Sequence, residues 1–260
     1  MNVLITGGAS GIGFSLALKL IKNGHLVYLC VHNKKEIKTT LDKIKNIDYQ
    51  DRVSVMKLDI TKKDDRELVT KLDIDCLVNQ AGIGIGGSLI NMEISDIRKN
   101  FDINFFGTLA LNKEYIKSRG NRKGKVLITS SLAGIMPIPY LGSYSATKAA
   151  LSIFARALRL ELKKTNKNIK IKLIEPGAYK TGFNQYMIEN KEKLDFDEFI
   201  ENKESIIENQ QKLFSLFEKE DLSSIVNKMY KAILSDNNKL VYRSPLLHVI
   251  GAKFYMMFFM

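Results

Sequence analysis

Short apolar runs alternate along the chain with longer stretches whose apolar residues recur every three or four positions. The runs predict buried β-strands, and the longer stretches predict amphipathic helices. Strands are expected at Asn2–Thr6, Leu26–Val31, Val53–Leu58, Cys76–Asn79, Lys125–Ser130, Ile169–Glu175 and Lys239–Tyr242. Because strands that alternate with helices form parallel sheets, we predict an α/β fold with a doubly wound parallel sheet and helices on both faces.

The whole chain, residues 1–260, is expected to form one domain, because no repeat, proline-rich linker or low-complexity tract divides it. Residues 182–220 are a long connection after the sixth strand with a helical apolar pattern. We interpret this segment as a lid over a ligand pocket. Its apolar positions are Phe183, Tyr186, Met187, Phe196, Phe199, Ile200, Ile206, Ile207, Leu213, Phe214, Leu216 and Phe217.

A glycine-rich turn separates the first strand from a helix pattern that Gly24 closes. Gly7, Gly11 and Gly13 have the spacing G-x-x-x-G-x-G, which differs from the common dinucleotide fingerprint G-x-G-x-x-G. Glycines in such a strand–turn–helix unit let the backbone approach a pyrophosphate, and the helix N-terminus attracts its charge. The turn therefore predicts a dinucleotide site, the alternative being that its glycines only turn the chain.

The end of the second strand favours a phosphorylated dinucleotide. An acidic residue at this position binds a ribose 2′-hydroxyl. Here Val31 is followed by His32, Asn33, Lys34 and Lys35, none of which is acidic. Basic side chains suit a 2′-phosphate, so we predict NADP(H) in preference to NAD(H). In the alternative interpretation, Lys34 and Lys35 only begin a solvated helix.

Tyr144 and Lys148 are four residues apart beside a helix pattern that runs from Ser145 to Leu162. Side chains at this spacing are neighbours on a helix, so the ammonium is expected to lower the pKa of the tyrosine hydroxyl. Ser131 follows another strand and is placed to hydrogen-bond the carbonyl oxygen that Tyr144 protonates. Together with the dinucleotide site, these residues predict an oxidoreductase that transfers a hydride between NADP(H) and a carbonyl or secondary alcohol.

These motifs, in this order, resemble the short-chain dehydrogenase/reductase family in its compact, single-domain form, over residues 1–182. The resemblance implies a Rossmann-like fold and a catalytic set of Asn104, Ser131, Tyr144 and Lys148. It also implies that Asn104 holds a water linking Lys148 to solvent, and that Lys148 binds the nicotinamide ribose. The expected cofactor-binding residues are Gly7, Ser10, Gly11, Ile12, Gly13, His32, Asn33, Asp59, Ile60, Asn79, Ala81, Gly82, Tyr144, Lys148, Pro176, Gly177 and Thr181.

One position departs from the family pattern. Gln80 stands where the second asparagine of an N-N-A-G motif is expected, at a position that shapes the loop. Three of the assigned residues also fit plainer roles. In the simpler interpretation, Asp59 is only a turn residue, Asn104 only holds the backbone of a bent helix, and Thr181 is only the N-cap of the following segment.

A net charge of +12 at pH 7 is compatible with nucleic acid or anionic lipid as a partner. The lysines are spread without a dense basic block, so no nucleic-acid partner is expected.

Three scattered histidines lack metal-ligand spacing, and no metal site is predicted. Cys30 and Cys76 fall in predicted strands and indicate free thiols in a reducing cytoplasm. Because the first strand begins at residue 2, no leader peptide is expected.

Residues 244–260 form an apolar tail with Phe254, Tyr255, Met256, Met257, Phe258 and Phe259 near the end of the sequence. The tail is short and is interrupted by His248 and Lys253, which argues against a membrane span. Three environments fit it: packing over the substrate pocket, a subunit contact, or a membrane surface beside basic residues. The predicted location is the cytoplasm, at the periphery of a membrane if the third environment holds.

The predicted substrate is a small carbonyl compound or alcohol of apolar, lipid-like character. A 3-oxoacyl-thioester reductase is the alternative in the same class. A dinucleotide-sensing binding protein without turnover is the alternative from another class, and the complete set of Asn104, Ser131, Tyr144 and Lys148 argues against it. The family resemblance implies a homodimer or homotetramer through the helices after Asn91 and after Tyr144.

Overall fold

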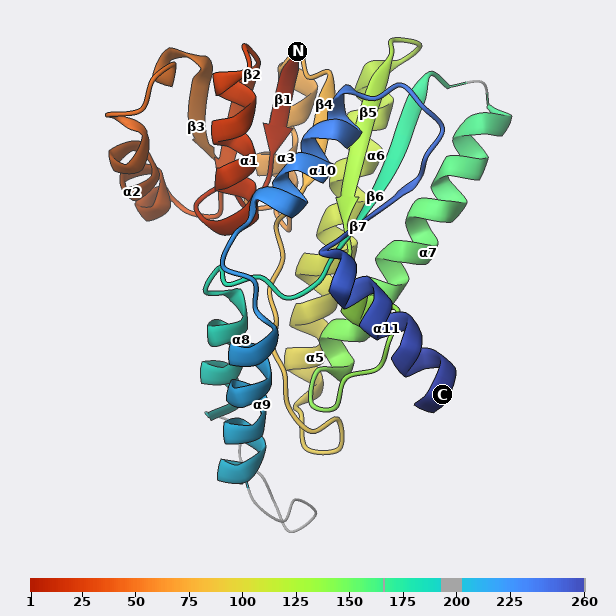
Figure 1. The fold of residues 1–260 in the computed structure, drawn as a ribbon. Coiled ribbons are helices and arrows are strands. Elements are labelled where there is room, and N and C mark those ends of the chain that lie inside the picture. The colour runs from red at the N-terminus through yellow and green to blue at the C-terminus, as the bar shows by residue number, and fades with distance from the viewer. Residues whose placement is uncertain (166, 193–202, 260) are drawn as a thin grey trace.

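The computed structural model describes residues 1–165, 167–192 and 203–259. The strands of this part form one parallel sheet in the order β3-β2-β1-β4-β5-β6-β7 (Figure 1). Their bounds are β1 Asn2–Ile5, β2 Leu26–Val31, β3 Val53–Lys57, β4 Cys76–Asn79, β5 Gly124–Thr129, β6 Ile169–Pro176 and β7 Val241–Ser244. The chain leaves β1 toward one edge of the sheet and leaves β4 toward the other. A crevice at such a switch point is where sheets of this kind bind ligands.

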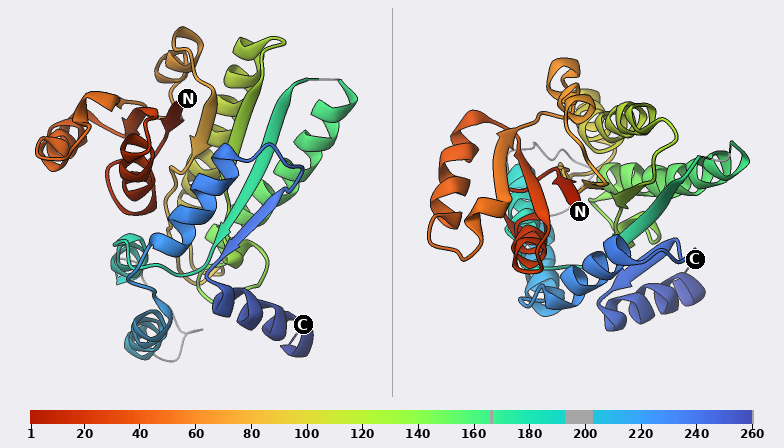
Figure 2. Two further views of the ribbon diagram at one scale, coloured as in Figure 1. Left: turned by 45° about the horizontal axis from the view of Figure 1, so that its top comes forward. Right: turned by 90° about the horizontal axis from the view of Figure 1, so that it is seen from above.

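Helices cover both faces of the sheet, which confirms the predicted doubly wound architecture (Figure 2). The longer helices are α1 Gly11–Lys22, α2 Lys34–Ile44, α5 Ile94–Phe101, α6 Thr108–Arg119, α7 Gly142–Lys164, α8 Phe183–Glu192, α9 Lys203–Phe217, α10 Ser223–Leu234 and α11 Leu246–Phe259. Two short helices, α3 Lys63–Arg66 and α4 Leu68–Lys71, precede β4. A π-helical segment, Asp102–Gly107, joins α5 to α6. None of the described helices is long and apolar enough to cross a membrane.

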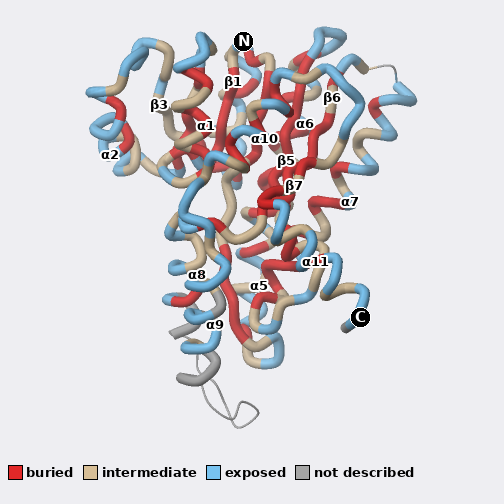
Figure 3. The backbone as a smooth tube through the Cα atoms, in the orientation of Figure 1, coloured by how far each residue is buried: buried red, intermediate tan, exposed pale blue. Residues whose placement is uncertain are grey.

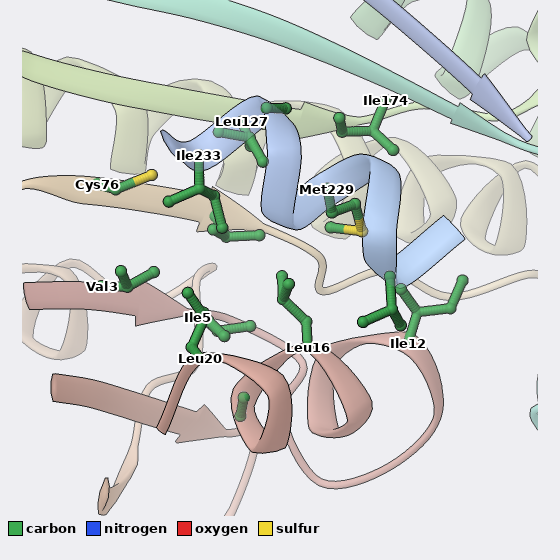
Figure 4. Close-up of a cluster of buried hydrophobic side chains, with 14 of the residues drawn as sticks. Val3, Ile5, Ile12, Leu16, Leu20, Cys76, Leu127, Ile174, Met229 and Ile233 are labelled. Atoms are coloured by element: carbon green, nitrogen blue, oxygen red, sulfur yellow. The ribbon is translucent and has the colours of Figure 1, made fainter. Parts of the chain in front are cut away.

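Two apolar cores lie on the two faces of the sheet, and the side chains of β1 alternate between them. Val3 and Ile5 belong to the core under α1 and α10, whereas Leu4 belongs to the core under α6 and α7. Figure 4 shows the first core, in which Leu16 of α1 and Met229 of α10 lie on opposite sides of the same apolar layer. Because a parallel strand is buried on both faces, its sequence is apolar throughout, and this is why the apolar runs located the strands.

Two predicted boundaries differ from the structure. The last strand is Val241–Ser244 instead of Lys239–Tyr242, because the carbonyl of Lys239 accepts a hydrogen bond from the Lys172 ammonium (3.0 Å) and lies before the β6–β7 ladder. Helix α7 begins at Gly142, three residues earlier than its apolar pattern indicates, so Tyr144 lies in the first turn.

Helices α8, α9 and α11 lie beyond the carboxyl ends of the strands, in the lower half of Figure 1. Of the apolar positions assigned to the lid, Phe196, Phe199 and Ile200 lie outside the described residues. The predicted apolar tail is helix α11, many of whose residues are exposed (Figure 3). Cys30 and Cys76 are buried in β2 and β4 and are not bonded to each other, as predicted.

Candidate active site

A cavity of about 1210 Å³ lies at the carboxyl ends of β1, β4, β5 and β6. The predicted site residues on its wall are Gly7, Ser10, Gly11, Ile12, Gly13, Ala81, Gly82, Ser131, Tyr144, Lys148, Pro176, Gly177 and Thr181. The predicted residues that lie off the wall are His32, Asn33, Asp59, Ile60, Asn79 and Asn104. The parallel sheet therefore gathers residues from five separate segments into one site, because all its strands end on the same side.

The glycine turn has the geometry of a pyrophosphate cradle. Gly7 has a φ of +66°, and a Cβ atom there would lie 2.8 Å from the backbone of Ala81. A Cβ atom at Gly13 would lie 2.5 Å from the carbonyl oxygen of Gly7. Ser10 at the N-cap makes no side-chain capping bond, so the first N–H groups of α1 remain available to an anion. These residues fit the phosphates of a dinucleotide.

Ser131, Tyr144 and Lys148 meet on the wall of the cavity. The Ser131 side chain is hydrogen-bonded to the Tyr144 hydroxyl. Lys148, one turn further along α7, places its Nζ 5.6 Å from the centroid of the Tyr144 ring and donates a hydrogen bond to the carbonyl of Thr129 (3.1 Å). The two hydroxyls and the amine thus form one group that faces the cavity.

In this geometry the pKa of Tyr144 is raised overall, whereas its spacing to Lys148 led us to expect a lowered pKa. Burial raises the pKa of Tyr144 to about 12, and the hydrogen bond with Ser131 opposes that rise only in part. Burial also lowers the pKa of Lys148 to about 8. For both side chains, the free-energy cost of burying a charge is larger than the electrostatic stabilisation that their proximity provides. At neutral pH, Tyr144 therefore carries a proton that it can donate.

Asn104 lies fully buried in the π-helical segment and holds the loop after β4. Its Oδ1 accepts a hydrogen bond from the Ile83 amide (2.8 Å), and its Nδ2 donates to the Ile83 carbonyl (2.9 Å) and to Thr147 Oγ1 of α7 (3.1 Å). A Cβ atom at Gly82 would lie 3.0 Å from Asn104 Oδ1 and 3.4 Å from Lys148 Nζ. Gly82 thus keeps open the space between these two side chains, where the predicted water relay would run.

Asn100, one helical turn before Asn104, makes the same set of contacts with the same loop. Its Oδ1 accepts from the Ile85 amide (3.0 Å), and its Nδ2 donates to the Ile85 carbonyl (2.8 Å) and to Ser143 Oγ of α7 (2.9 Å). The sequence analysis did not single out Asn100. Its four-residue spacing from Asn104, matched by Ser143 and Thr147 on α7, is the signal that would have found it.

Asp59 lies at the end of β3 beside two basic side chains. Its Oδ1 accepts hydrogen bonds from the Thr61 amide (3.0 Å) and hydroxyl (2.7 Å), and its Oδ2 lies 4.0 Å from both His32 Nδ1 and Lys62 Nζ. Burial favours a higher pKa for Asp59, but the Thr61 hydrogen bonds and the charges of His32 and Lys62 bring the pKa below its ordinary value. The carboxylate is therefore ionised and held in a fixed orientation.

Glu36 lines the cavity and was missed by the sequence analysis. Its carboxylate accepts hydrogen bonds from the His32 amide (3.0 Å) and from Asn33 Nδ2 (2.9 Å), while Asn33 Oδ1 caps α2 by accepting from the Glu36 amide (3.0 Å). The pair Asn33-x-x-Glu36 is a capping pattern that is visible in the sequence. The helix cap thus brings a carboxylate close to the position where the strand end itself has none.

Asn79 lies behind the cavity wall, whereas Gln80 is part of that wall, and both side chains support it. Asn79 Nδ2 donates hydrogen bonds to Asn112 Oδ1 (2.7 Å) and to the Leu127 carbonyl (3.2 Å), which ties β4 to β5 and α6. Gln80, the position that departs from the family motif, accepts a hydrogen bond from Thr129 Oγ1 (2.9 Å). The substitution therefore keeps the loop attached to β5.

The short chain dehydrogenase family model matches residues 1–192. The chain belongs to this family. Its members are oxidoreductases that use a nicotinamide dinucleotide, and the glycine cradle described above fits that cofactor.

Relatives of this short-chain dehydrogenase include curated proteins and a solved structure. A probable short-chain type dehydrogenase/reductase, VdlC, of Helicobacter pylori is 34% identical over 202 residues, which are 74% of this chain and 70% of that protein. A 3-ketodihydrosphingosine reductase of Bacteroides thetaiotaomicron is 35% identical over 188 residues, 70% of this chain and 65% of that protein. A short-chain dehydrogenase/reductase of Burkholderia phymatum in complex with NAD has a TM-score of 0.80 at 19% identity, covering 98% of this chain and 92% of its own, and so shares the fold.

The roof of the cavity in this short-chain dehydrogenase comes from α8, α9 and α11. The Phe183 ring of α8 lies 5.7 Å from the Tyr144 ring, and Met187 is 1% exposed against Gly84. On α11, His248 Nδ1 accepts a hydrogen bond from the Ala178 amide (3.3 Å). The tail therefore packs over the pocket, and its residues on the pocket wall are Leu247, His248, Gly251, Ala252 and Tyr255. Packing over the pocket is one of the three environments that the sequence predicted for the tail, but the contacting residues were not predicted.

Proposed function

We propose that this short-chain dehydrogenase interconverts a carbonyl group and a secondary alcohol on an apolar, lipid-like substrate, with NADP(H). The observation that carries the proposal is the pair of hydroxyls of Ser131 and Tyr144, backed by Lys148, beside the apolar part of the cavity wall. A carbonyl oxygen is the substrate atom that accepts from both hydroxyls.

The side chains have separate roles in the proposed reduction. A bound nicotinamide dinucleotide supplies the hydride. Tyr144 donates its proton to the carbonyl oxygen, and Ser131 donates a hydrogen bond to the same oxygen. The Lys148 ammonium stabilises the tyrosinate that remains. The space beside Gly82, between Lys148 and Asn104, is where we infer that a water restores the proton.

The preference for NADP(H) is supported by basic side chains near the glycine turn and the end of β2. The His32 side chain is 65% exposed, and Lys43 Nζ donates a hydrogen bond to the Ala9 carbonyl within the turn (2.8 Å). Glu36 opposes a 2′-phosphate, but its carboxylate is occupied by the backbone of His32 and the amide of Asn33. We infer that the basic side chains decide the balance in favour of the phosphorylated cofactor.

The apolar character of the substrate is inferred from the part of the cavity around Tyr144. Its wall there is formed by Ile138, Leu141, Phe183, Met187 and Phe214. The relative from Bacteroides thetaiotaomicron, a 3-ketodihydrosphingosine reductase, is named for a long-chain ketone substrate, which agrees with this inference.

We also propose that two copies associate through the outward faces of α7 and the π-helical segment. Ile153 and Leu160 lie seven residues apart on α7 and are 67% and 63% exposed, and Phe106 is 53% exposed. Phe106 contacts Phe105, which in turn contacts Phe154 of α7, so these exposed side chains belong to one area. An exposed apolar area of this kind favours a subunit contact.

The test is NADPH consumption by the purified full chain against steroid, retinoid, long-chain and 3-oxoacyl-thioester ketones, with NADH in parallel. Tyr144→Phe should lose at least about a hundredfold in kcat while its affinity for NADPH, measured by fluorescence titration, is unchanged. Best turnover of the thioester would favour a 3-oxoacyl-thioester reductase. Tight NADPH binding without turnover of any ketone would favour a dinucleotide-sensing protein and count against the proposal.

A further inference from the structure

The outward face of α11 carries a row of exposed apolar side chains. Leu247, Ile250, Phe254 and Phe258 follow one another at spacings of three or four residues and are 54–80% exposed. Residues at this spacing share one face of a helix. Leu246 and Met257 are also exposed and widen the row, and we call these six residues the α11 apolar face. A continuous apolar area of this kind on a protein surface marks a site of interaction.

The α11 apolar face is continuous with the mouth of the active-site cavity. Leu247 belongs to both, and the exposed side chains of Leu216 and Phe217 at the end of α9 complete the rim. The rings of Phe217 and His248 meet edge to face, with centroids 6.4 Å apart, so α9 and α11 come together at this point. An apolar molecule that leaves the cavity here passes directly onto the α11 apolar face.

The charge on α11 favours an anionic partner. Lys253 is exposed on α11 itself, and the helix has no acidic residue. In the sequence, Asp236 is the sole acidic residue after Asp221. Asp236 pairs with Lys125 at 3.0 Å, near the amino end of β5 and therefore at the opposite end of the sheet from α11. Within the described residues, α11 thus presents one lysine and apolar groups without a carboxylate.

A second apolar groove of about 440 Å³ lies along the other side of α11. Its apolar wall includes Leu132, Ile135 and Met256, and its cationic side chains are Arg243, which is paired with the buried carboxylate of Glu175 (2.5 Å), and Lys253. An apolar groove with a lysine at its wall suits an acyl chain that carries an anionic head group. Both sides of α11 therefore favour the same chemistry.

The length of α11 decides how it would meet a lipid bilayer. Its 14 residues correspond to about 21 Å of helix, shorter than the roughly 30 Å of a hydrocarbon core. A helix of this length with a polar flank lies along the interface, with its apolar face in the acyl region. A second copy of the chain on the same face would cover the rim of the cavity and close the substrate's route, whereas a bilayer would supply an apolar substrate through it.

We propose that the α11 apolar face, with Leu216 and Phe217, docks the protein on an anionic lipid bilayer and holds the mouth of the cavity open to the lipid. The substrate then enters from the bilayer instead of from water. This inference rests on the proposed function for the identity of the substrate, but the docking itself can be measured without turnover.

The test is co-sedimentation of the full chain with vesicles of phosphatidylcholine containing 30% phosphatidylglycerol, and with vesicles of phosphatidylcholine alone. The variant Phe254→Ser/Phe258→Ser removes two exposed rings, 4.4 Å apart, that do not line the cavity. Its partition onto anionic vesicles should fall at least about tenfold. The matched control is Leu41→Ser, which replaces an exposed apolar residue on α2. This variant should bind the vesicles as the wild-type protein does.

Three results would overturn the docking proposal. The first is that the wild-type protein fails to bind anionic vesicles. The second is that the double variant binds these vesicles as well as the wild-type protein does. The third is that the double variant forms a smaller oligomer than the wild-type protein in light scattering. The last result would assign the α11 apolar face to a second copy of the chain.

The docking proposal and the proposed function fail in different measurements. With a short, water-soluble ketone, the double variant should keep the turnover of the unchanged protein. With a long-chain ketone embedded in anionic vesicles, its turnover should fall at least about tenfold. Loss of vesicle binding with both turnovers unchanged would contradict substrate entry from the bilayer, whereas absence of turnover on any ketone would contradict the proposed function alone.

Discussion

Lys148 loses its charge within the pH range in which dehydrogenases are assayed. Burial lowers its pKa to about 8, while Tyr144, with a pKa raised to about 12, keeps its proton. As the pH rises through 8, the ammonium that stabilises the tyrosinate is lost. We therefore expect kcat for carbonyl reduction to fall about tenfold per pH unit above pH 8.

The control for this profile is Lys148→Met, which should have a low kcat without the decline above pH 8. Steady-state rates at saturating cofactor between pH 6 and pH 10 make the comparison. A profile for the unchanged protein that stays flat to pH 10 would show that Lys148 does not act through its charge.

Gly82 separates Asn104 from Lys148, and its replacement tests the relay. In Gly82→Ala the new methyl group would lie 3.0 Å from Asn104 Oδ1 and 3.4 Å from Lys148 Nζ. We expect kcat to fall at least about tenfold, because the path that returns a proton to Tyr144 is narrowed. The free energy of unfolding, measured with urea, serves as the control for folding. An unchanged kcat in a folded variant would place the proton path elsewhere.

The segment from α5 through the π-helix acts as a support for both the loop after β4 and helix α7. Asn100 supplies three of the buried hydrogen bonds in this support. Asn100→Ala would leave the Ile85 amide and carbonyl buried without partners, so we expect a loss of about 2–4 kcal/mol in the free energy of unfolding. Asn168→Ala, at an exposed position before β6, should cost less than about 0.5 kcal/mol. Equal losses in urea unfolding would contradict the role of Asn100.

The exposed area on α7 gives a prediction about the assembled molecule. Ile153→Asp/Leu160→Asp places two charges where the proposed subunit contact buries apolar side chains. Light scattering should show a dimer or tetramer for the unchanged protein and a monomer for the variant, because burying unpaired carboxylates is costly. The Phe254→Ser/Phe258→Ser variant should keep the oligomer. A monomeric unchanged protein at micromolar concentration would contradict the proposed contact.

The sheet and most of the candidate site could be predicted from the sequence. Apolar runs located the strands because both faces of a parallel sheet are buried, and the site residues followed because the strands all end on one side. Gly7, Ser131 and Tyr144 are far apart in the sequence, but each lies just beyond a strand or in the first turn of a helix that leads away from one.

Features that depend on long-range contacts could not be predicted in this way. The start of β7 depends on Lys172, a buried lysine whose ammonium binds the Asn237 and Lys239 carbonyls. The pKa of Tyr144 depends on how much of the molecule surrounds it, which the spacing to Lys148 does not reveal. The carboxylate of Glu36 reaches the cavity because the cap of α2 turns it backward.

The matching contacts of Asn100 and Asn104 also fix the rotational phase of α7. Ser143 and Thr147, which they bind, each precede a proposed catalytic residue by one position, namely Tyr144 and Lys148. A rotation of α7 about its axis that displaced Tyr144 and Lys148 would also break the contacts of Ser143 and Thr147. Inserting one residue ahead of Ser143 would turn that point of the helix by about 100°. A change in the length of this end of α7 would therefore displace both contacts together with the two side chains that they position.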